Sequence, residues 1–448
     1  MKKKARAKEL EQLAEKLVRF GLKSGADEVE VTISDDREFS LDVRLAQIEN
    51  LLEAGSRAVG LKVIKDKKTA FAASSDLSQE TLRRLVKNAV ARAELANRDE
   101  CAGLPLVFSE NSNTAALDLF DPEIGELEPD RKIRLALDTE RIALKDKRIT
   151  NSHGASLVTN EVLTVLANSK GFMGSCEQTF CSLSLGLQAG ETDNKVEDYW
   201  FSTERFFKRL EPPELLARKA VERTVRLLNP RKIKTQAVPV IFEPQMTAWL
   251  LGFLFACVSG MAVYQKATFL AGRLGTRIGN GKVTVIDDGL VPGRLGTRPF
   301  DTEGVACQKT TVLEKGILRQ YLCNTYAGRK LDLPSTGNAD GAGVSPNNFY
   351  LVPGSLSAEE IIASTERGFI LTRTIGHGLN PATGDISRGA FGLWVEKGEV
   401  VYPAAEVTVS GNLENILKNI EAVGNDLDFR TAVCGPTIKI AELIVAGE

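Results

Sequence analysis

Histidine is nearly absent from this chain of 448 residues, which contains only His153 and His377. Catalytic zinc is usually held by three protein ligands, and these most often include two histidines on one helix. No such pair can be drawn from a sequence whose two histidines lie in distant regions. Histidine-based chemistry is therefore limited to one residue in each of two parts of the chain.

Paired cysteines and blocks of one charge are also missing. The seven cysteines lie far apart without a CxxC motif, which argues against a disulfide scaffold or a zinc ribbon and predicts reduced thiols in the cytoplasm. Lys plus Arg (57) nearly equals Asp plus Glu (59), so we expect no nucleic-acid partner. The basic N-terminus leads into a charged helix and not into an apolar signal sequence.

Charged side chains are missing from Pro244 to Gln265, and the run from Met246 to Val258 is densely apolar. A helix that is apolar on all sides is either buried or inserted in a membrane. A bilayer needs about 20 such residues, whereas this run is shorter and is interrupted by Gly252. The sequence therefore predicts a buried helix at the centre of the C-terminal half, and no membrane partner.

The first hundred residues have the periodicity of an α+β domain (1–100). Apolar residues recur at helical spacing near the N-terminus, and Ser78 is a suitable N-cap for a second helix. Alternating apolar and polar residues between these helices predict antiparallel strands. The expected elements are a helix at 8–20, strands at 28–34, 39–43, 57–64 and 69–73, and a helix after Ser78.

The polar stretch 101–130 shows no sustained period and is expected to be a linker or a surface loop. A second α+β domain is predicted at 131–232, where a charged helix, four strands and a helix that starts at Pro212 and Pro213 follow one another. The expected elements are a helix at 131–145, strands at 155–159, 162–168, 177–187 and 199–202, and a helix that ends at 228.

Glycine marks a change of composition in the third region (233–448), which holds 27 of the 38 glycines. Glycine at this density, with short β-rich runs between, is typical of a largely β domain with many turns. The runs Val312–Leu318 and Trp394–Val400 share a Glu-Lys-Gly turn and predict two tight hairpins. The predicted fold class is thus α+β: N-terminal α+β domains with antiparallel sheets, then a β-rich C-terminal domain around the buried apolar helix.

The loop Gly376–Gly389 is the main candidate for contact with a substrate. It gathers a histidine, an aspartate, a serine and an arginine among glycines that allow another backbone to approach. The alternative is a polar turn in which Asp385 and Ser387 satisfy their own backbone. The candidate substrate-binding residues are Gly376, His377, Gly378, Thr383, Gly384, Asp385, Ser387, Arg388 and Gly389.

Two further clusters leave alternatives open. Asp301 and Glu303 could serve acid–base chemistry, or they could hold a turn before the next strand. Cys434, followed by a glycine and a proline, could be a thiol ligand or nucleophile, although a buried cysteine without chemistry is the commoner case.

A series of short motifs in the C-terminal half resembles one known family. The motifs, in chain order, are PVIFEP, VYQKATFL, PFDTEGV, NTYAGRKL, STGNADG, TGDISRGAFGLWVEKGEVVYPAAEVTVSGNL and NIEAVGNDL. They resemble the TldD/PmbA family of bacterial and archaeal proteins, in particular its PmbA (TldE) branch, for which an older name is modulator of DNA gyrase. The likeness is dense from Val238 to Glu448 and rests on the order of elements before that.

The resemblance implies a zinc metallopeptidase family that acts on unfolded or short peptides. In the TldD branch the apolar helix carries an HExxxH motif, and a cysteine near the C-terminus completes the zinc site. The corresponding helix here, Trp249–Gly260, has neither histidine nor glutamate, and Cys434 matches only the family's C-terminal Cys-Gly. The resemblance therefore predicts no metal and no cofactor in this chain, and zinc in a TldD-like partner.

Two hypotheses remain for the function. In the first, the chain is a non-catalytic subunit that pairs with a TldD-like HExxxH subunit around a peptide substrate, as a homo- or hetero-oligomer built through the C-terminal domain. In the second, it is a stand-alone hydrolase that uses His377, Asp385 and Ser387. Whether this chain is itself an enzyme stays open, and the empty helix favours the first hypothesis.

Overall fold

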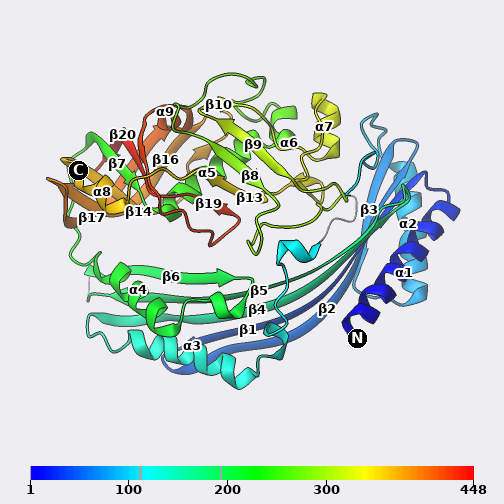
Figure 1. The fold of residues 1–448 in the computed structure, drawn as a ribbon, viewed down its shortest axis with the longest axis horizontal. Helices are drawn as coiled ribbons and strands as arrows, with labels where there is room; N and C mark the ends of the chain where they lie inside the picture. The colour runs from blue at the N-terminus through cyan, green and yellow to red at the C-terminus, as the bar shows by residue number, and fades with distance from the viewer. Residues whose placement is uncertain (1, 110–113, 192–193) are drawn as a thin grey trace.

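The computed structural model describes residues 2–109, 114–191 and 194–448 (Figure 1). The N-terminal half alternates helices with long strands. Its elements are α1 (Lys2–Lys23), β1 (Glu28–Arg44), β2 (Gln47–Lys65), β3 (Lys68–Ser74), α2 (Gln79–Leu95), α3 (Pro129–Ala143), β4 (Ile149–Asn168), β5 (Met173–Ala189), β6 (Val196–Glu204) and α4 (Pro213–Val225).

A single antiparallel sheet in the order β3-β2-β1-β4-β5-β6 organises this half. The ranges 1–100 and 131–232, predicted as two α+β domains, each contribute three neighbouring strands to it, and the pairing of β1 with β4 joins them. The α+β character and the antiparallel sheets are confirmed. The predicted N-cap is also confirmed, because the Ser78 side chain accepts a hydrogen bond from the backbone N–H of Thr81.

One face of this sheet is covered by two pairs of helices. Val29 and Ile33 of β1 belong to an apolar cluster with α1 and α2, whereas Phe39 and Leu41 belong to a cluster with α3 and α4. Because side chains alternate along a strand, these residues share one face. The C-terminal domain lies over the other face (Figure 1).

The strands are longer than the sequence predicts. The runs 28–34 and 39–43 form one strand, β1, and the runs 155–159 and 162–168 form one strand, β4. The polar break at Asp35 misled the prediction. Asp35 is buried within β1, where its carboxylate pairs with Arg6 and lies 3.0 Å from Arg57 Nε. An aspartate with two cationic partners is compatible with a continuous strand.

The predicted linker 101–130 is a packed loop where the structure describes it; residues 110–113 lie outside the described part. Its regular elements within the described residues are two short 3-10 helices, Thr114–Leu117 and Ile124–Glu126, and the start of α3 at Pro129. Arg329 Nη1 of the C-terminal domain donates to the carbonyls of Cys101 (3.0 Å) and Gly103 (2.9 Å). These bonds attach the start of the loop to the C-terminal domain.

The C-terminal half is rich in short strands. Its elements are β7 (Gln236–Phe242), α5 (Pro244–Val258), α6 (Gly260–Tyr264), β8 (Val285–Asp288), β9 (Lys309–Glu314), β10 (Ile317–Leu318), α7 (Thr325–Leu331), β11 (Ala339–Asp340), β12 (Gly343–Val344), β13 (Asn348–Leu351), α8 (Ala358–Ala363), β14 (Arg367–Ile375), β15 (Leu379–Asn380), β16 (Asp385–Glu396), β17 (Glu399–Asn412), α9 (Leu413–Lys418), β18 (Ile420–Val423), β19 (Val433–Cys434) and β20 (Ile438–Ala446). The strands β14, β7, β20, β17 and β16 pair in sequence, and β16 pairs back to β14, so they close a barrel.

The apolar helix predicted at 246–258 is α5, which packs in the largest apolar core together with barrel strands. It starts with Pro244 at a first-turn position, where a missing N–H costs nothing. The two predicted hairpins are also present. Lys315 and Gly316 both have positive φ (47° and 80°). A tight two-residue turn with positive φ matches the right-handed twist of the strands that it joins.

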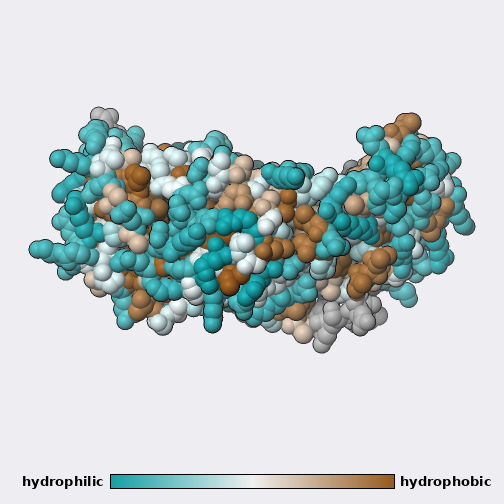
Figure 2. Space-filling model, turned by 90° about the horizontal axis from the view of Figure 1, so that it is seen from above, coloured by the Kyte–Doolittle hydropathy of each residue, from teal (hydrophilic) through white to brown (hydrophobic). Residues whose placement is uncertain are grey.

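The surface is mainly hydrophilic in the view from above, with separate apolar patches (Figure 2). Among the described residues, none of the helices combines the length and the apolar composition needed to cross a lipid bilayer.

Candidate functional site

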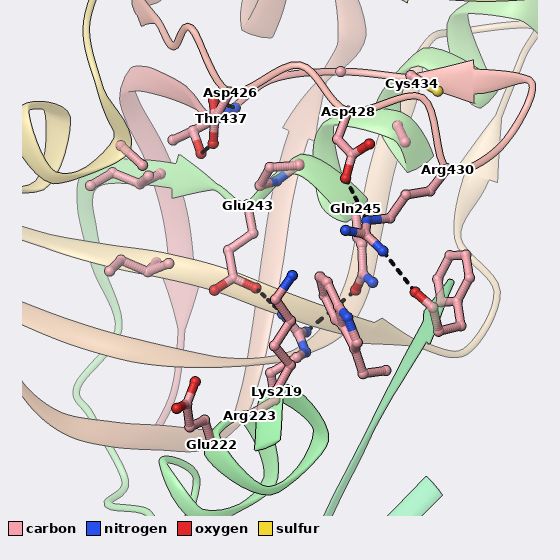
Figure 3. Close-up of a pocket in the computed structure, with 18 of the residues that line it drawn as sticks. Lys219, Glu222, Arg223, Glu243, Gln245, Asp426, Asp428, Arg430, Cys434 and Thr437 are labelled. Carbon is pink, nitrogen blue, oxygen red and sulfur yellow. Dashed lines mark hydrogen bonds and ion pairs between the residues drawn. The ribbon is translucent and has the colours of Figure 1, made fainter. Parts of the chain in front are cut away.

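A pocket of about 660 Å³ lies between the N-terminal sheet and the C-terminal domain (Figure 3). One wall comes from β6 and α4, and the other from the β7–α5 junction and the segment 426–437. The pocket therefore lies at the N-terminal end of the apolar helix that the sequence identifies as central. Its charged lining residues are Lys219, Glu222, Arg223, Arg226, Glu243, Asp426, Asp428 and Arg430.

Glu243, the residue before α5, is the best-paired acid of the pocket. Arg226 binds its two carboxylate oxygens through Nη1 (2.6 Å) and Nη2 (3.0 Å), and Arg223 Nη1 donates from 3.1 Å. Burial raises the pKa of Glu243, but the two arginines outweigh burial and hold the pKa below its usual value. Since Arg223 belongs to α4 and Arg226 is its C-cap, this cluster joins the N-terminal half to the start of α5.

A second charged cluster surrounds Trp200 of β6. The guanidinium of Arg430 lies over the indole ring at 4.5 Å, and its Nη2 donates to Glu211 Oε1 at 2.8 Å. Glu211 also accepts from the Trp200 indole N–H (2.9 Å) and from Lys219 (2.8 Å). Burial alone would raise the pKa of Glu211. The three donors outweigh burial, so the pKa lies below its usual value. The cluster holds the 426–437 segment against the N-terminal sheet.

Cys434 lines the pocket as a buried thiol. It is 2% exposed, its Sγ donates to the carbonyl of Thr431 at 2.8 Å, and burial raises its pKa. The next residue, Gly435, packs so closely on α5 that an added Cβ would lie 2.3 Å from Thr247 Cγ2 and 3.2 Å from Leu251 Cδ1. The helix face beside the cysteine therefore presents a hydroxyl and an alkyl group.

These residues do not fit the zinc that the family name implies. A catalytic zinc usually has three protein ligands, and the described lining of the pocket offers one thiol, no histidine, and carboxylates that do not gather with the thiol into a group of three. His153 lies on β4 beside Glu197 (3.3 Å), and His377 lies on the loop Gly376–Gly389; neither lines the pocket. In the part of the chain that the structure describes, no group of three or more His, Cys, Asp or Glu side chains is arranged to hold a metal.

The loop Gly376–Gly389 lies apart from this pocket, as a small extension of the barrel. Asn380 and Asp385 pair across its tip, and the glycines carry the turns. Gly384 has a φ of 81°, and an added Cβ at Gly378 would lie 1.8 Å from the carbonyl oxygen of Ser387. Any residue with a Cβ is therefore excluded at position 378. The tight loop needs glycine there for its shape, whatever the function of the loop.

The side chains of this loop are not arranged as a catalytic triad. No hydrogen bond joins any two of His377, Asp385 and Ser387, each of which the structure describes. Asp385 Oδ1 accepts from Asn412 Nδ2 (2.9 Å), and this bond lowers its pKa. Ser387 Oγ accepts from Ser410 Oγ at 3.3 Å.

Arg388 connects the loop to α5. Its guanidinium lies over the ring of Trp249 at 5.3 Å, and its Nε donates to the carbonyl of Ile375 at 3.4 Å. It does not pair with Asp385, although their spacing in the sequence allows it. Trp249 follows Ala248, which lines the pocket, so the loop and the pocket contact neighbouring residues of one helix.

The carboxylates of Asp301 and Glu303 accept hydrogen bonds from backbone N–H groups. Asp301 accepts from the N–H groups of Glu303 (2.9 Å), Val305 (3.0 Å) and Ala339 (2.9 Å). Glu303 Oε2 accepts from Thr325 N at 2.8 Å. The sequence left open whether these carboxylates serve acid–base chemistry or hold a turn, and the structure supports the turn.

The pocket itself was missed by sequence reasoning, apart from Cys434. Its charged residues come from segments more than two hundred positions apart, such as Lys219 and Arg430, and no local pattern in the sequence marks either of them. One signal was present: Glu243 is the last charged residue before the uncharged run that starts at Pro244.

Three family models cover most of the chain. The PmbA/TldA metallopeptidase domain 1 matches residues 29–93, the central domain matches 122–228, and the C-terminal domain matches 235–447. Among curated relatives, "Metalloprotease PmbA" of Escherichia coli O157:H7 is 35% identical over 94% of this chain and 93% of its own. A "Metalloprotease PmbA homolog" of Haemophilus influenzae is 34% identical over 99% and 97%.

Solved structures share the whole architecture. A protein described as a modulator of DNA gyrase from Bacteroides thetaiotaomicron has a TM-score of 0.91 at 25% identity and covers 98% of each chain. TldE from Thermococcus kodakarensis has the same fold, with a TM-score of 0.87 at 24% identity, over 97% of this chain and 100% of its own. The family models and the bacterial relatives together show that this chain belongs to the PmbA/TldD metallopeptidase family.

Proposed function

We propose that this chain is a non-catalytic subunit of a cytoplasmic peptide-processing metallopeptidase, and that a TldD-like subunit with an HExxxH helix supplies the zinc. The observation that carries the proposal is the contact between α5 and Cys434. The helix residues beside Gly435 are Thr247 and Leu251, neither of which offers a histidine or a carboxylate as a second metal ligand to the adjacent Cys434.

The surroundings of Cys434 support the same proposal. Its buried Sγ donates to the carbonyl of Thr431, and neither histidine of the chain lines the pocket beside it. The ion pairs of Glu243 and Glu211 lie in the pocket walls, where they connect the two halves of the chain. They serve to fix the wall of a peptide chamber whose chemistry takes place in the partner.

The loop Gly376–Gly389 is our candidate for contact with the peptide. It is largely exposed, open space surrounds the Cβ position of Gly376, and Asp385 and Arg388 present one acid and one cation. An extended peptide that adds to a strand edge gains backbone hydrogen bonds and tolerates many sequences.

Reconstitution tests the proposal. This chain alone, a TldD-like subunit alone and an equimolar mixture are each incubated with an unstructured peptide, and cleavage is followed by mass spectrometry. We expect cleavage only where the HExxxH subunit is present, a higher rate in the mixture, and loss of cleavage when that subunit's glutamate is replaced. Cleavage by this chain alone, purified free of the other subunit, would contradict the proposal.

A further inference from the structure

A second pocket, of about 320 Å³, lies on the helix-covered face of the N-terminal sheet. Its lining comes from β1, β2, β4, the 3-10 helix Ile124–Glu126 and Lys132 of α3, and it is called the Lys132 pocket below. Arg37, which also lines it, lies on β1 between Ile33, which packs with α1 and α2, and Phe39, which packs with α3 and α4. Because alternate residues of a strand share a face, the Lys132 pocket lies between the two pairs of helices.

Lys132 is a buried cation that is not paired with an anion. The residue is 8% exposed, and its ammonium lies over the ring of Phe39, 4.3 Å from the ring centre. Among the described residues, none forms an ion pair or a hydrogen bond with this ammonium. Burial lowers the pKa of Lys132, and the nearby carboxylates of Glu53 and Glu161 act in the opposite direction without outweighing burial. A buried charge is costly unless it is paired, so this ammonium is placed to meet an anionic group that enters the pocket.

The acid on the other side of Phe39 is Glu53 of β2. Glu53 lies directly opposite Phe39 in the register of β1 and β2, and it is exposed. Within the described part of the chain, its carboxylate has neither an ion pair nor a hydrogen bond. It can therefore accept charge-assisted hydrogen bonds from an ammonium group of a ligand.

Small residues keep the Lys132 pocket open. Gly55 of β2 lies opposite Arg37, so both belong to the same face of the sheet. The nearest atom that an added Cβ at Gly55 would meet is the carbonyl oxygen of Asp36, at 3.8 Å, an ordinary contact distance. An added Cβ at Gly125 would instead lie 2.2 Å from Glu161 Oε1. Glycine at these two positions leaves room beside Arg37 and lets the Glu161 side chain reach the 3-10 helix.

We propose that the Lys132 pocket binds a small zwitterion, a molecule with one carboxylate and one ammonium group such as a free amino acid or a dipeptide. The ligand carboxylate accepts from Lys132, with Arg37 as a second, exposed cation, and the ligand ammonium donates to Glu53. An apolar side chain of the ligand packs on Phe39 and Ile124. The volume of the pocket suits a ligand of this class.

The mixture of charges favours a zwitterion over a simple ion. A phosphate or another anion would pair with Lys132, but it would also lie near the carboxylates of Glu53 and Glu161, and like charges repel. A simple cation would leave the Lys132 ammonium without an anion. The proposal uses no residue of the pocket at α5 or of the loop Gly376–Gly389, so its failure would leave the proposed function as it is.

Isothermal titration calorimetry with defined probes tests the specificity. The full-length chain is titrated with L-leucine, glycyl-L-leucine, N-acetylglycyl-L-leucine, which lacks the ammonium, and glycyl-L-leucinamide, which lacks the carboxylate. We expect a zwitterion to bind, and the comparison of leucine with glycyl-leucine shows whether an amino acid or a dipeptide fits better. Each blocked peptide should bind about tenfold more weakly than glycyl-leucine or worse, the loss expected for one charge-assisted hydrogen bond. No binding of either zwitterion, or a blocked peptide that binds as well as the free one, would overturn the proposal.

Two variants locate the binding. Lys132→Met removes the ammonium and keeps a long side chain on Phe39, and Gly55→Val places a side chain in the pocket at a strand position that suits valine. Each should raise the dissociation constant of the bound zwitterion about tenfold or more. The control is Arg134→Met, which removes a cation from an exposed position of α3 outside the pocket and should leave binding unchanged.

Circular dichroism and thermal unfolding show whether each variant is folded. Glu53→Gln, at an exposed position, keeps the test open if a change at 132 or 55 prevents folding. It should also raise the dissociation constant of the zwitterion about tenfold, because the ammonium of the ligand loses its anion. Unchanged binding in the folded Lys132→Met or Glu53→Gln variant, or an equal loss in Arg134→Met, would overturn the proposal.

Discussion

Two glutamates at opposite ends of the contact between the N-terminal sheet and the C-terminal domain make an instructive comparison. Glu243 lies against Arg223 and Arg226. Glu30 of β1 is 7% exposed and faces one cation, Lys62, the residue directly opposite it on β2. Lys62 is shared, because its Nζ also lies 3.5 Å from Glu303 Oε1.

Burial acts in the same direction on both carboxyl groups, yet their pKa values move apart. Burial, helped by the nearby carboxylates of Glu303 and Asp301, outweighs Lys62 and raises the pKa of Glu30 to about 7. Two arginines hold the pKa of Glu243 below its usual value. The difference shows that the number of cations, and not burial, decides whether an acid between the domains stabilises this fold in its charged form.

The largest effect is expected from Glu243→Ala. It leaves two half-buried arginines without their common anion, while Arg223 keeps Asp198 at 3.2 Å, and it should lower the free energy of unfolding by about 3 kcal/mol. Because the pKa of Glu243 is lowered on folding, its contribution is present at neutral pH and is lost as the pH falls through that pKa. Denaturant unfolding at pH 7 and at acidic pH measures both.

The matched control for Glu243→Ala is Glu222→Ala. Glu222 lines the same pocket from α4, but it is exposed and its nearest cation is Arg218, at 3.8 Å. Its removal should cost less than about 1 kcal/mol. Equal losses for the two variants would show that the charge cluster around Glu243 does not join the domains.

Glu30→Gln should change the pH dependence of stability in the opposite direction. A pKa raised to about 7 means that the folded chain keeps a proton which the unfolded chain releases above its ordinary pKa of 4.5. The free energy of unfolding should therefore fall by roughly 3 kcal/mol as the pH rises from 4 to 8.

The Glu30→Gln variant should lack this fall and be more stable than the wild type at pH 8. Glu38→Gln, an exposed position further along the same strand, serves as control and should leave the pH profile as it is. Identical profiles for Glu30→Gln and the wild type would mean that Glu30 is charged at neutral pH in the folded chain.

The smallest effects on stability are expected in the exposed loop. Asp385→Ala and Arg388→Ala should leave folding and assembly unchanged and reduce peptide cleavage by the reconstituted complex roughly tenfold, the loss expected for one hydrogen bond to a substrate. Glu399→Ala, at the exposed far end of the β16–β17 hairpin, is the control. Reduced thermal stability with unchanged cleavage per folded complex would make the loop a scaffold.

The sequence predicted local structure well where one segment decides it. The apolar run before Val258 and the capping residue Ser78 needed no distant partner. The continuous β1 was missed because Asp35 looks like a strand break until Arg6 and Arg57 are brought to it. Pairing of β1 with β4 was missed for the same reason, since it joins residues more than a hundred positions apart.

The site shows the same limit. Cys434 was identified from its motif, but the pocket around it depends on contacts such as Arg430 with Glu211, for which the sequence has no periodic signal. The turn predicted at Gly376–Gly389 ends earlier in the structure, because β16 already begins at Asp385. Contact between this loop and a peptide depends on the assembled complex, and a local sequence pattern does not reveal it.

Metal content tests the central claim, that this chain has no zinc site of its own, most directly. The chain is purified without a TldD-like subunit, incubated with zinc, dialysed, and its zinc measured by elemental analysis beside that of the reconstituted complex. The account predicts no stoichiometric zinc in the isolated chain, and the same low value for Cys434→Ser, against one zinc per HExxxH subunit in the complex. One retained zinc per chain that disappears in Cys434→Ser would contradict it.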